Sequence, residues 1–236
     1  MNKQTFLEKL NNVLFPHYSC PFCGRETQDG VVCKSCNHNK INANFCAKCG
    51  EHILDNEKIC YICKDLERVF DSNYSCYEYN EETSGAIMAL KYNDKKYLAK
   101  DFAKILFERF KTLDLHIDIV TSVPMSAEAQ KKREYNHAAE IAKEFCKLAD
   151  LKYEDLLAKI KSTPRQAELG RDERIKNLVG SFAIIDKQVI KDKNILIIDD
   201  VFTTGSTMTA CATELKKAKP NKVYCLTVTK TKNPEM

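Results

Sequence analysis

Apolar residues change their spacing along the chain. Beyond about residue 70, short apolar runs alternate with stretches in which apolar residues recur at i, i+3 and i+4, the spacing of an amphipathic helix. Extended segments are expected at 68–80, 117–124, 194–200 and 222–230, and helices at 81–92, 97–110, 134–150 and 206–219. Strands that alternate with helices predict an α/β fold with a mostly parallel sheet covered on both faces.

Three other segments give weaker patterns. Residues 5–14 have the spacing of one short amphipathic helix. The stretch 153–160, YEDLLAKI, fits a strand and a helix equally well. Residues 161–182 are polar and contain Pro164 and Gly170, which predicts a long loop with a helical turn or two.

Cysteine is concentrated at one end of the chain. Eight of the twelve cysteines lie between Cys20 and Cys63, whereas Cys76, Cys146, Cys211 and Cys225 stand singly in apolar surroundings typical of buried small side chains. This shift in composition predicts two domains, a cysteine-rich domain at 1–66 and an α/β domain at 67–236.

The cysteine-rich segment repeats itself. CPFCGRETQDGVVCKSC and CAKCGEHILDNEKICYIC each contain two C-x2-C pairs, the spacing of a zinc knuckle. We expect two structural zinc sites, formed by Cys20, Cys23, Cys33 and Cys36 and by Cys46, Cys49, Cys60 and Cys63. An interleaved pairing, disulfides, a redox dithiol and an iron–sulfur cluster are the alternatives, and the last three fit four tandem pairs less well.

Charge and hydropathy limit the class of protein. The formal net charge is +4, and two zinc–thiolate quartets would bring it near zero, so bulk charge does not argue for nucleic acid. No apolar run reaches the roughly 18 residues that a membrane span needs. We therefore expect a cytoplasmic protein without a membrane span.

The stretch 195–207, ILIIDDVFTTGST, carries the clearest chemistry. An apolar strand leads into Asp199 and Asp200, a site beyond the carboxyl end of a strand where α/β proteins bind ligands. Two adjacent carboxylates suit a sugar diol or hydrated Mg²⁺. The following hydroxyl-rich turn enters a helix whose amino terminus favours a phosphate. The combination predicts a ribose 5-phosphate site, although a capped βα turn alone would explain the hydroxyls.

This stretch resembles the 5-phosphoribosyl 1-pyrophosphate (PRPP) motif of type I phosphoribosyltransferases. The resemblance implies that the acidic pair contacts the ribose hydroxyls, with Mg²⁺ accompanying PRPP. It assigns the 5-phosphate to Thr203, Thr204, Gly205, Ser206 and Thr207. Phe202 is bulkier than the aliphatic residue usual at its position.

Further segments are similar to the ComF family, whose members carry an amino-terminal zinc ribbon. They are ALKY at 89–92, SVPMSAEAQKKREYNHAAEIAK from Ser122 and TPRQAELGRDERIKNLVGSF from Thr163. The resemblance implies a pyrophosphate site at Val123 and Pro124, followed by matching Arg133, Tyr135 and Asn136, with Glu134 where the family has glycine. The later tract corresponds to a flexible loop in which Gln166, Arg174 and Asn177 match.

The resemblance also implies chemistry and partners. Lys91 and Arg133 would neutralise the leaving pyrophosphate, so Asp199, Asp200, Lys91 and Arg133 are the catalytic candidates. The ComF resemblance implies a role in natural competence and DNA uptake, with single-stranded DNA and competence proteins such as a DNA-translocating helicase as partners. Basic residues at 131–133, 159–165 and 171–176 are candidates for a strand-binding groove. A transferase acting on an unidentified acceptor outside DNA uptake and an inactive scaffold are the alternatives.

Overall fold

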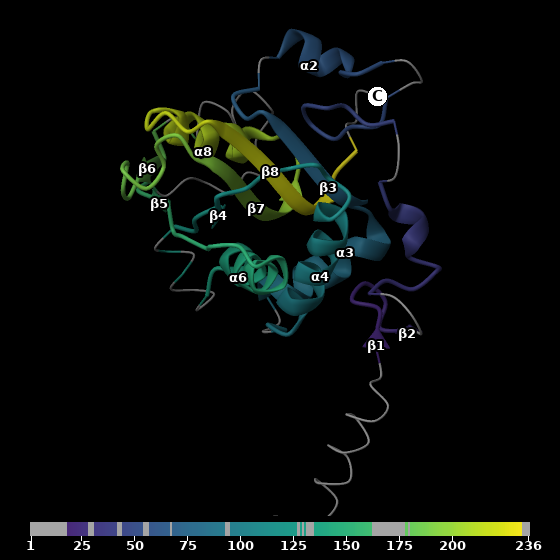
Figure 1. The fold of residues 1–236 in the computed structure, drawn as a ribbon. Coiled ribbons are helices and arrows are strands. Elements are labelled where there is room, and N and C mark those ends of the chain that lie inside the picture. The colour runs from purple at the N-terminus through teal and green to yellow at the C-terminus, as the bar shows by residue number, and fades with distance from the viewer. Residues whose placement is uncertain are drawn as a thin grey trace, which may run out of the picture.

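Four parallel strands form the centre of the computed structural model (Figure 1). It describes residues 18–27, 31–41, 44–53, 57–66, 68–92, 95–126, 135–161 and 180–232, with the single residues 128, 130 and 178. The order across the sheet is β3 (Ser72–Glu78), β8 (Lys222–Lys230), β7 (Asn194–Phe202) and β4 (Ile119–Ser122). All neighbouring pairs are parallel, so the carboxyl ends of the strands meet at one edge of the sheet.

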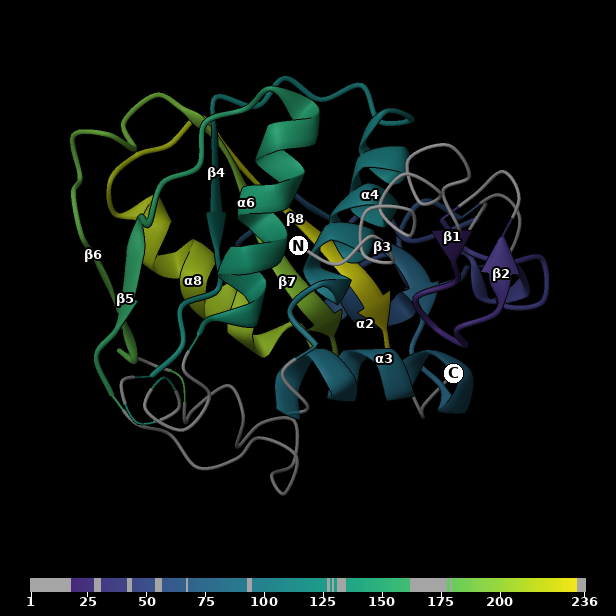
Figure 2. The same ribbon diagram turned by 90° about the horizontal axis from the view of Figure 1, so that it is seen from below.

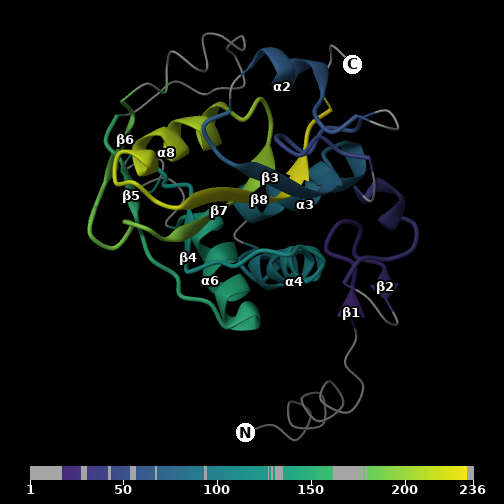
Figure 3. The same cartoon turned by 45° about the horizontal axis from the view of Figure 1, so that its top comes forward.

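Helices cover both faces of this sheet. Helices α3 (Glu81–Tyr92), α4 (Leu98–Phe110) and α6 (His137–Ala149) pack on one face, seen from its own side in Figure 2. Helix α8 (Ser206–Lys216) packs on the other face (Figure 3). Residues of β7 alternate between the two cores, with Leu196 and Ile198 toward α4 and α6 and Ile195 and Ile197 toward α8. The predicted α/β fold is confirmed, and the reason is the apolar character of β7 on both faces.

Several element boundaries differ from the predicted ones. Strand β7 continues through Phe202, beyond the acidic pair, because Phe202 still pairs with Lys230 of β8. Helix α6 begins at His137, because the Asn136 side chain caps it by accepting from two backbone N–H groups. The ambiguous stretch 153–160 contains β5 (Leu157–Lys159), which pairs antiparallel with β6 (Phe182–Ile184). The expected helix at 5–14 and most of the predicted long loop, residues 162–177, lie outside the described residues.

The cysteine-rich segment packs against the edge strand β3. It contains β1 (Tyr18–Ser19), β2 (Glu26–Thr27), the 3-10 helix η1 (Asn37–Asn39) and α2 (Tyr61–Asp65). The Ile41 N–H donates to the Cys76 carbonyl, and the Asn73 N–H donates to the Lys48 carbonyl. The segment thus occupies backbone groups of an otherwise open sheet edge. The division into domains at 1–66 and 67–236 stays a prediction.

The cysteines outside the two quartets are buried, as predicted. Cys76, Cys146, Cys211 and Cys225 are buried, with exposed fractions of 3%, 6%, 0% and 0%. Among the described residues, no helix combines the length and the apolar character that a bilayer crossing requires.

Asp71 ties the start of β3 to β8 and α8. Its carboxylate accepts the Val223 N–H at 2.9 Å and lies 2.9 Å from Lys222 Nζ and 3.1 Å from Lys216 Nζ. Burial disfavours ionisation, but the Val223 N–H and the two lysines outweigh it and hold the pKa of Asp71 below its ordinary value. This carboxylate therefore stabilises the fold in its ionised form.

Replacing Asp71 with asparagine is expected to lower the free energy of unfolding at pH 7 by about 1–2 kcal/mol, because charge-assisted hydrogen bonds are lost. Because the pKa of Asp71 is lower in the folded protein than in the unfolded chain, its carboxylate stabilises the fold fully at pH values above the unfolded pKa of about 4. This stabilisation is lost as the pH falls through the folded pKa. Urea denaturation should therefore show that wild type loses more stability than the variant as the pH is lowered below about 4. Asp101→Asn, which breaks one pair with Lys104 on α4, is the control; equal losses in both variants would contradict the expectation.

Candidate functional site

The predicted acidic pair lies where β7 reaches the edge of the sheet. Asp200 is 2% exposed, and the Asp199 carboxylate accepts the Asp200 N–H at 2.9 Å. The hydroxyl of Thr229, on the neighbouring strand β8, donates to the Asp200 carbonyl. These contacts fix the backbone at the pair, so the two carboxylates are presented from a rigid strand rather than from a loop.

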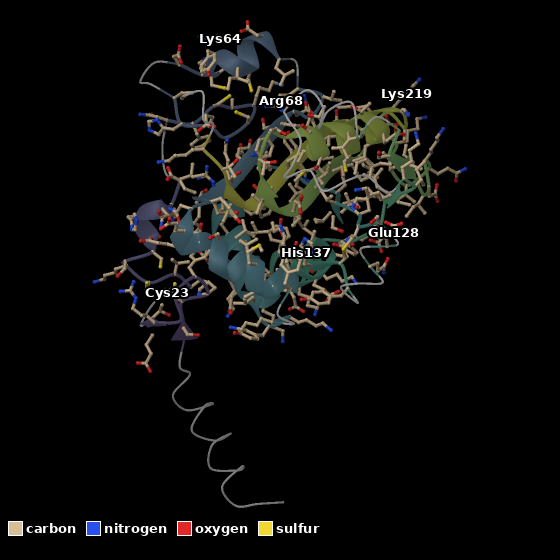
Figure 4. The ribbon with its side chains drawn as sticks, turned by 180° about the vertical axis from the view of Figure 1, so that it is seen from behind. Cys23, Lys64, Arg68, Glu128, His137 and Lys219 are labelled. Atoms are coloured by element: carbon tan, nitrogen blue, oxygen red, sulfur yellow. The ribbon has the colours of Figure 1, made fainter. Side chains whose placement is uncertain are left out.

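Two basic side chains converge on Asp200. Lys91 Nζ, from the last turn of α3, lies 2.8 Å from Asp200 Oδ2. His137, which is labelled in Figure 4, lies at the start of α6, and its Nε2 is 3.0 Å from the same oxygen. Both are ion-pair distances, and both basic groups approach the same carboxylate oxygen. Asp200, Lys91 and His137 thus form a largely buried cluster of ionisable groups beside Asp199.

The pKa values of Asp199 and Asp200 are shifted in opposite directions in this cluster. Burial works against ionisation of Asp200, but the nearby charges of Lys91 and His137 outweigh it and hold the pKa of Asp200 below its usual range. Burial, together with the charge of Asp200, raises the pKa of Asp199 to about 7. Burial lowers the pKa of Lys91, but the attraction of Asp200 is stronger and leaves it raised. At neutral pH, Asp200 is ionised and Lys91 is protonated.

The loop after β4 faces the same edge. Asn136 Nδ2 donates to the Val123 carbonyl at 3.0 Å, while its Oδ1 caps α6. The Val123 N–H donates to the Ile198 carbonyl of β7. Asn136 therefore connects the Val123–Pro124 loop to the helix that carries His137, and it places the imidazole beside the acidic pair.

The hydroxyl-rich turn enters α8 as predicted. Gly205 has a φ of 79°, and the Thr204 and Ser206 hydroxyls are 2.7 Å apart. The first turn of α8, which is fully described, carries no acidic residue, so its N–H groups and helix dipole favour an anion. Thr203 is exposed, Thr204 and Thr207 are half-buried, and Ser206 is buried. The turn has the donors and the sign of potential that a phosphate needs.

The structure brings together only part of the predicted site. Asp199, Asp200 and Lys91 lie together, and β7 leads directly into the 203–207 turn. Arg133, Gln166, Arg174 and Asn177 fall outside the described residues. His137 was not predicted from the sequence, although a histidine directly after a helix-capping asparagine and close to the Val-Pro loop was an available signal.

A group of potential metal ligands coincides with this site. Ligand atoms of His137, Asp199 and Asp200 lie within 4.8 Å of one another. Carboxylate oxygens suit Mg²⁺, which keeps several waters and binds through one or two carboxylates. Asp199 and Asp200 are the residues that would hold such an ion.

The cysteines form the two predicted quartets. Sulfur atoms of Cys20, Cys23, Cys33 and Cys36 lie within 4.8 Å of one another, as do those of Cys46, Cys49, Cys60 and Cys63. The Cys23 and Cys33 sulfurs are 3.5 Å apart, and those of Cys49 and Cys60 are 3.7 Å apart. A tetrahedral zinc with Zn–S bonds of about 2.3 Å places sulfurs about 3.8 Å apart. The sulfurs group as the predicted quartets and not in the interleaved pairing, and both clusters fit zinc.

Comparison with known protein families gives one match to the cysteine-rich segment and one to the α/β segment. The family described as "Phosphoribosyl transferase domain" matches residues 88–235, and "Double zinc ribbon domain" matches residues 10–64. The chain belongs to the phosphoribosyl transferase family. Within this family, the predicted resemblance to ComF proteins is confirmed by curated relatives that match most of the chain.

Three curated relatives of this phosphoribosyl transferase family member match most of its length. Competence protein F of Haemophilus influenzae is 23% identical, over 79% of this chain and 84% of its own length. Competence protein ComFC of Bacillus subtilis is 26% identical over 85% of this chain and 84% of its own. ComFC of Streptococcus pneumoniae is 27% identical over 80% of this chain and 83% of its own length. The similarity therefore extends beyond residues 88–235, which match the phosphoribosyl transferase domain.

Proposed function

We propose that this protein binds PRPP together with Mg²⁺ at the edge of the sheet formed by β7 and β4. The observation that carries the proposal is the acidic pair, of which Asp200 is buried and Asp199 half-buried, and which leads within three residues into a glycine turn at the amino terminus of α8. Asp199 and Asp200 would contact the ribose hydroxyls and the ion, and the 203–207 turn would bind the 5-phosphate. The pyrophosphate would lie along the Val123–Pro124 loop.

The cluster around Asp200 also supports transferase chemistry. When the bond between C1 and the pyrophosphate oxygen breaks, negative charge develops on the leaving group, and Lys91 supplies a fixed positive charge next to the acidic pair. Arg133, which lies outside the described residues, would add a second positive charge, as the resemblance to the family implies. Magnesium, when bound, would neutralise pyrophosphate oxygens. The acceptor that attacks C1 is left unassigned.

The protein is expected to bind PRPP at least tenfold more tightly with Mg²⁺ than with a chelator, because the ion offsets the charge of the pyrophosphate beside two carboxylates. Calorimetric titration with PRPP, with and without Mg²⁺, measures this. Ribose 5-phosphate, which lacks the pyrophosphate, is the control and should bind more weakly with little dependence on Mg²⁺. Equal affinities for PRPP under both conditions would contradict the role of magnesium.

We further propose that the protein handles single-stranded DNA in natural competence, on the cytoplasmic side of the membrane. The names of its relatives suggest a role in natural competence. The residues that follow Lys91 in the sequence have side chains that suit single-stranded DNA. Tyr92 and Tyr97 are 50% and 60% exposed, and Lys95 and Lys96 are exposed between them. Exposed aromatic rings among cations stack bases and attract the backbone. The basic clusters predicted at 131–133 and 171–176 lie outside the described residues.

Replacing both Tyr92 and Tyr97 with alanine is expected to weaken binding of a fluorescent oligothymidylate at least tenfold, because each stacked base contributes about 1–3 kcal/mol. Fluorescence anisotropy at two salt concentrations measures the affinity. Tyr61→Ala, which removes another exposed tyrosine on α2, is the matched control and should have no effect. Unchanged binding by the double variant would mean that single-stranded DNA binds at another surface.

A further inference from the structure

Arg68 reaches from the end of the cysteine-rich segment into the glycine turn. Its side chain, labelled in Figure 4, is largely buried, with 9% of the residue exposed. Its Nη1 donates to the Thr204 carbonyl at 2.8 Å. Thr204 lies 136 positions later in the sequence. In a trans peptide, the carbonyl and the following N–H point in opposite directions. Holding the Thr204 carbonyl toward Arg68 therefore directs the Gly205 N–H away from Arg68, into the turn.

The guanidinium of Arg68 is held by two aromatic rings. Its Cζ lies 5.8 Å from the centre of the Phe70 ring and 5.9 Å from that of Phe202, and the two rings meet edge to face at 6.1 Å. A Cβ added to Gly205 would lie 2.6 Å from Arg68 Nη1 and 2.6 Å from Phe202 Cζ. The turn is therefore closely packed against both side chains. This packing gives a reason for Phe202, the one bulky departure from the motif.

Residues of the second cysteine quartet segment also reach the Phe202 ring through Lys230. Lys230 Nζ lies 5.5 Å from the centre of the Phe202 ring and 2.6 Å from Glu51 Oε2, with side chains 6% and 10% exposed. In the sequence, Glu51 lies between the two cysteine pairs of the second quartet, and its backbone carbonyl accepts the Cys46 N–H. Cys46, Cys49 and Cys60 share a core with Phe202 and Met208, whereas Cys20 and Cys36 belong to the core on the opposite face. The second quartet thus packs with the turn, and the first does not share that core.

We propose that Arg68 is a positioning residue for the 5-phosphate of PRPP, and that the second cysteine quartet holds it in place. The proposal rests on PRPP binding at the site described above. Arg68 does not contact the ligand in this assignment; it fixes the Thr204–Gly205 peptide so that the N–H groups of the turn face the phosphate. Binding of the 5-phosphate, and not of the pyrophosphate, depends on it.

The test compares Arg68→Met, which keeps the length of the side chain but removes its charge and donors, with Arg68→Lys, which keeps the charge. PRPP with Mg²⁺, ribose 5-phosphate, and inorganic pyrophosphate with Mg²⁺ are each titrated by calorimetry. Arg68→Met should weaken PRPP and ribose 5-phosphate at least tenfold and change pyrophosphate by less than twofold. Arg68→Lys should fall between Arg68→Met and the wild type. Arg109→Met is the matched control, because Arg109 also stacks on a ring, that of Phe45, but lies on α4.

The outcomes separate this proposal from the proposed function. If wild type does not bind PRPP, the proposed function fails and this proposal fails with it. If wild type binds PRPP and both Arg68 variants bind it within twofold of wild type, only the positioning role is overturned. An equal loss of all three ligands, or a loss of bound zinc that accompanies it, would show that Arg68 acts on folding alone and would also overturn the positioning role. If Arg68→Met does not fold, Arg68→Lys tests the proposal: weaker binding of PRPP and ribose 5-phosphate with unchanged binding of pyrophosphate supports the positioning role, and unchanged binding of all three overturns it.

Discussion

Replacing Lys91 with methionine is expected to lower the free energy of unfolding by about 3 kcal/mol, because it leaves a buried carboxylate short of a cation. The Asp200 side chain is 3% exposed and lies 2.8 Å from Lys91 Nζ, which is itself 21% exposed. His137 would be the remaining basic neighbour described at this oxygen. The expected loss lies at the lower end of the range for broken buried pairs, because water reaches part of the lysine.

The double variant Lys91→Met/Asp200→Asn is expected to recover most of this loss, since removing both charges leaves no unpaired ion. Urea denaturation of wild type, both single variants and the double variant gives the coupling energy. Lys104→Met, which breaks an exposed pair with Asp101, is the control and should change stability by less than about 0.5 kcal/mol. A double variant that is less stable than Lys91→Met would contradict the view that the two charges compensate each other.

Removing zinc is expected to unfold the cysteine-rich segment and to lower the Tm of the whole chain by more than about 10 °C. Structural zinc contributes about 10–16 kcal/mol in small zinc-binding peptides, and here sulfurs of both quartets are buried in the two cores of the sheet. Metal analysis should give two zinc ions per chain, one for each quartet. Thermal unfolding before and after treatment with a chelator measures the loss.

Single substitutions distinguish the two quartets. Cys63→Ser should lower the Tm more than Cys23→Ser, because Cys63 is half-buried and packs against the core that contains Phe202, whereas Cys23 is exposed. A value near one zinc per chain would mean that one quartet is not a metal site. An unchanged Tm after complete removal of zinc would contradict the structural role of both.

The parts of this site that lie close together in the sequence could be predicted from it. The acidic pair, the glycine turn and the cysteine quartets each fall within a short segment, and their spacing is set by local backbone geometry. The alternation of β7 between two cores follows from its continuous apolar run. The exact end of β7 could not be predicted, because it depends on pairing between Phe202 and Lys230 of a later strand.

The contacts between distant segments could not be predicted. Arg68 meets Thr204 across 136 positions, and Glu51 meets Lys230 across 179. His137 reaches Asp200 only because Asn136 both caps α6 and binds the Val123 carbonyl. Sequence patterns report periodicity and local turns, whereas these contacts depend on how the cysteine-rich segment and α6 pack around the sheet.

The central claim is that Asp199 and Asp200 bind the ribose of PRPP. Calorimetry of PRPP with Mg²⁺ on wild type and on Asp199→Asn/Asp200→Asn tests it most directly, because asparagine keeps the size of each side chain and removes its charge. The account predicts at least a hundredfold loss of affinity, about 2.7 kcal/mol, with circular dichroism showing that the variant remains folded. Equal affinity in both proteins would contradict it.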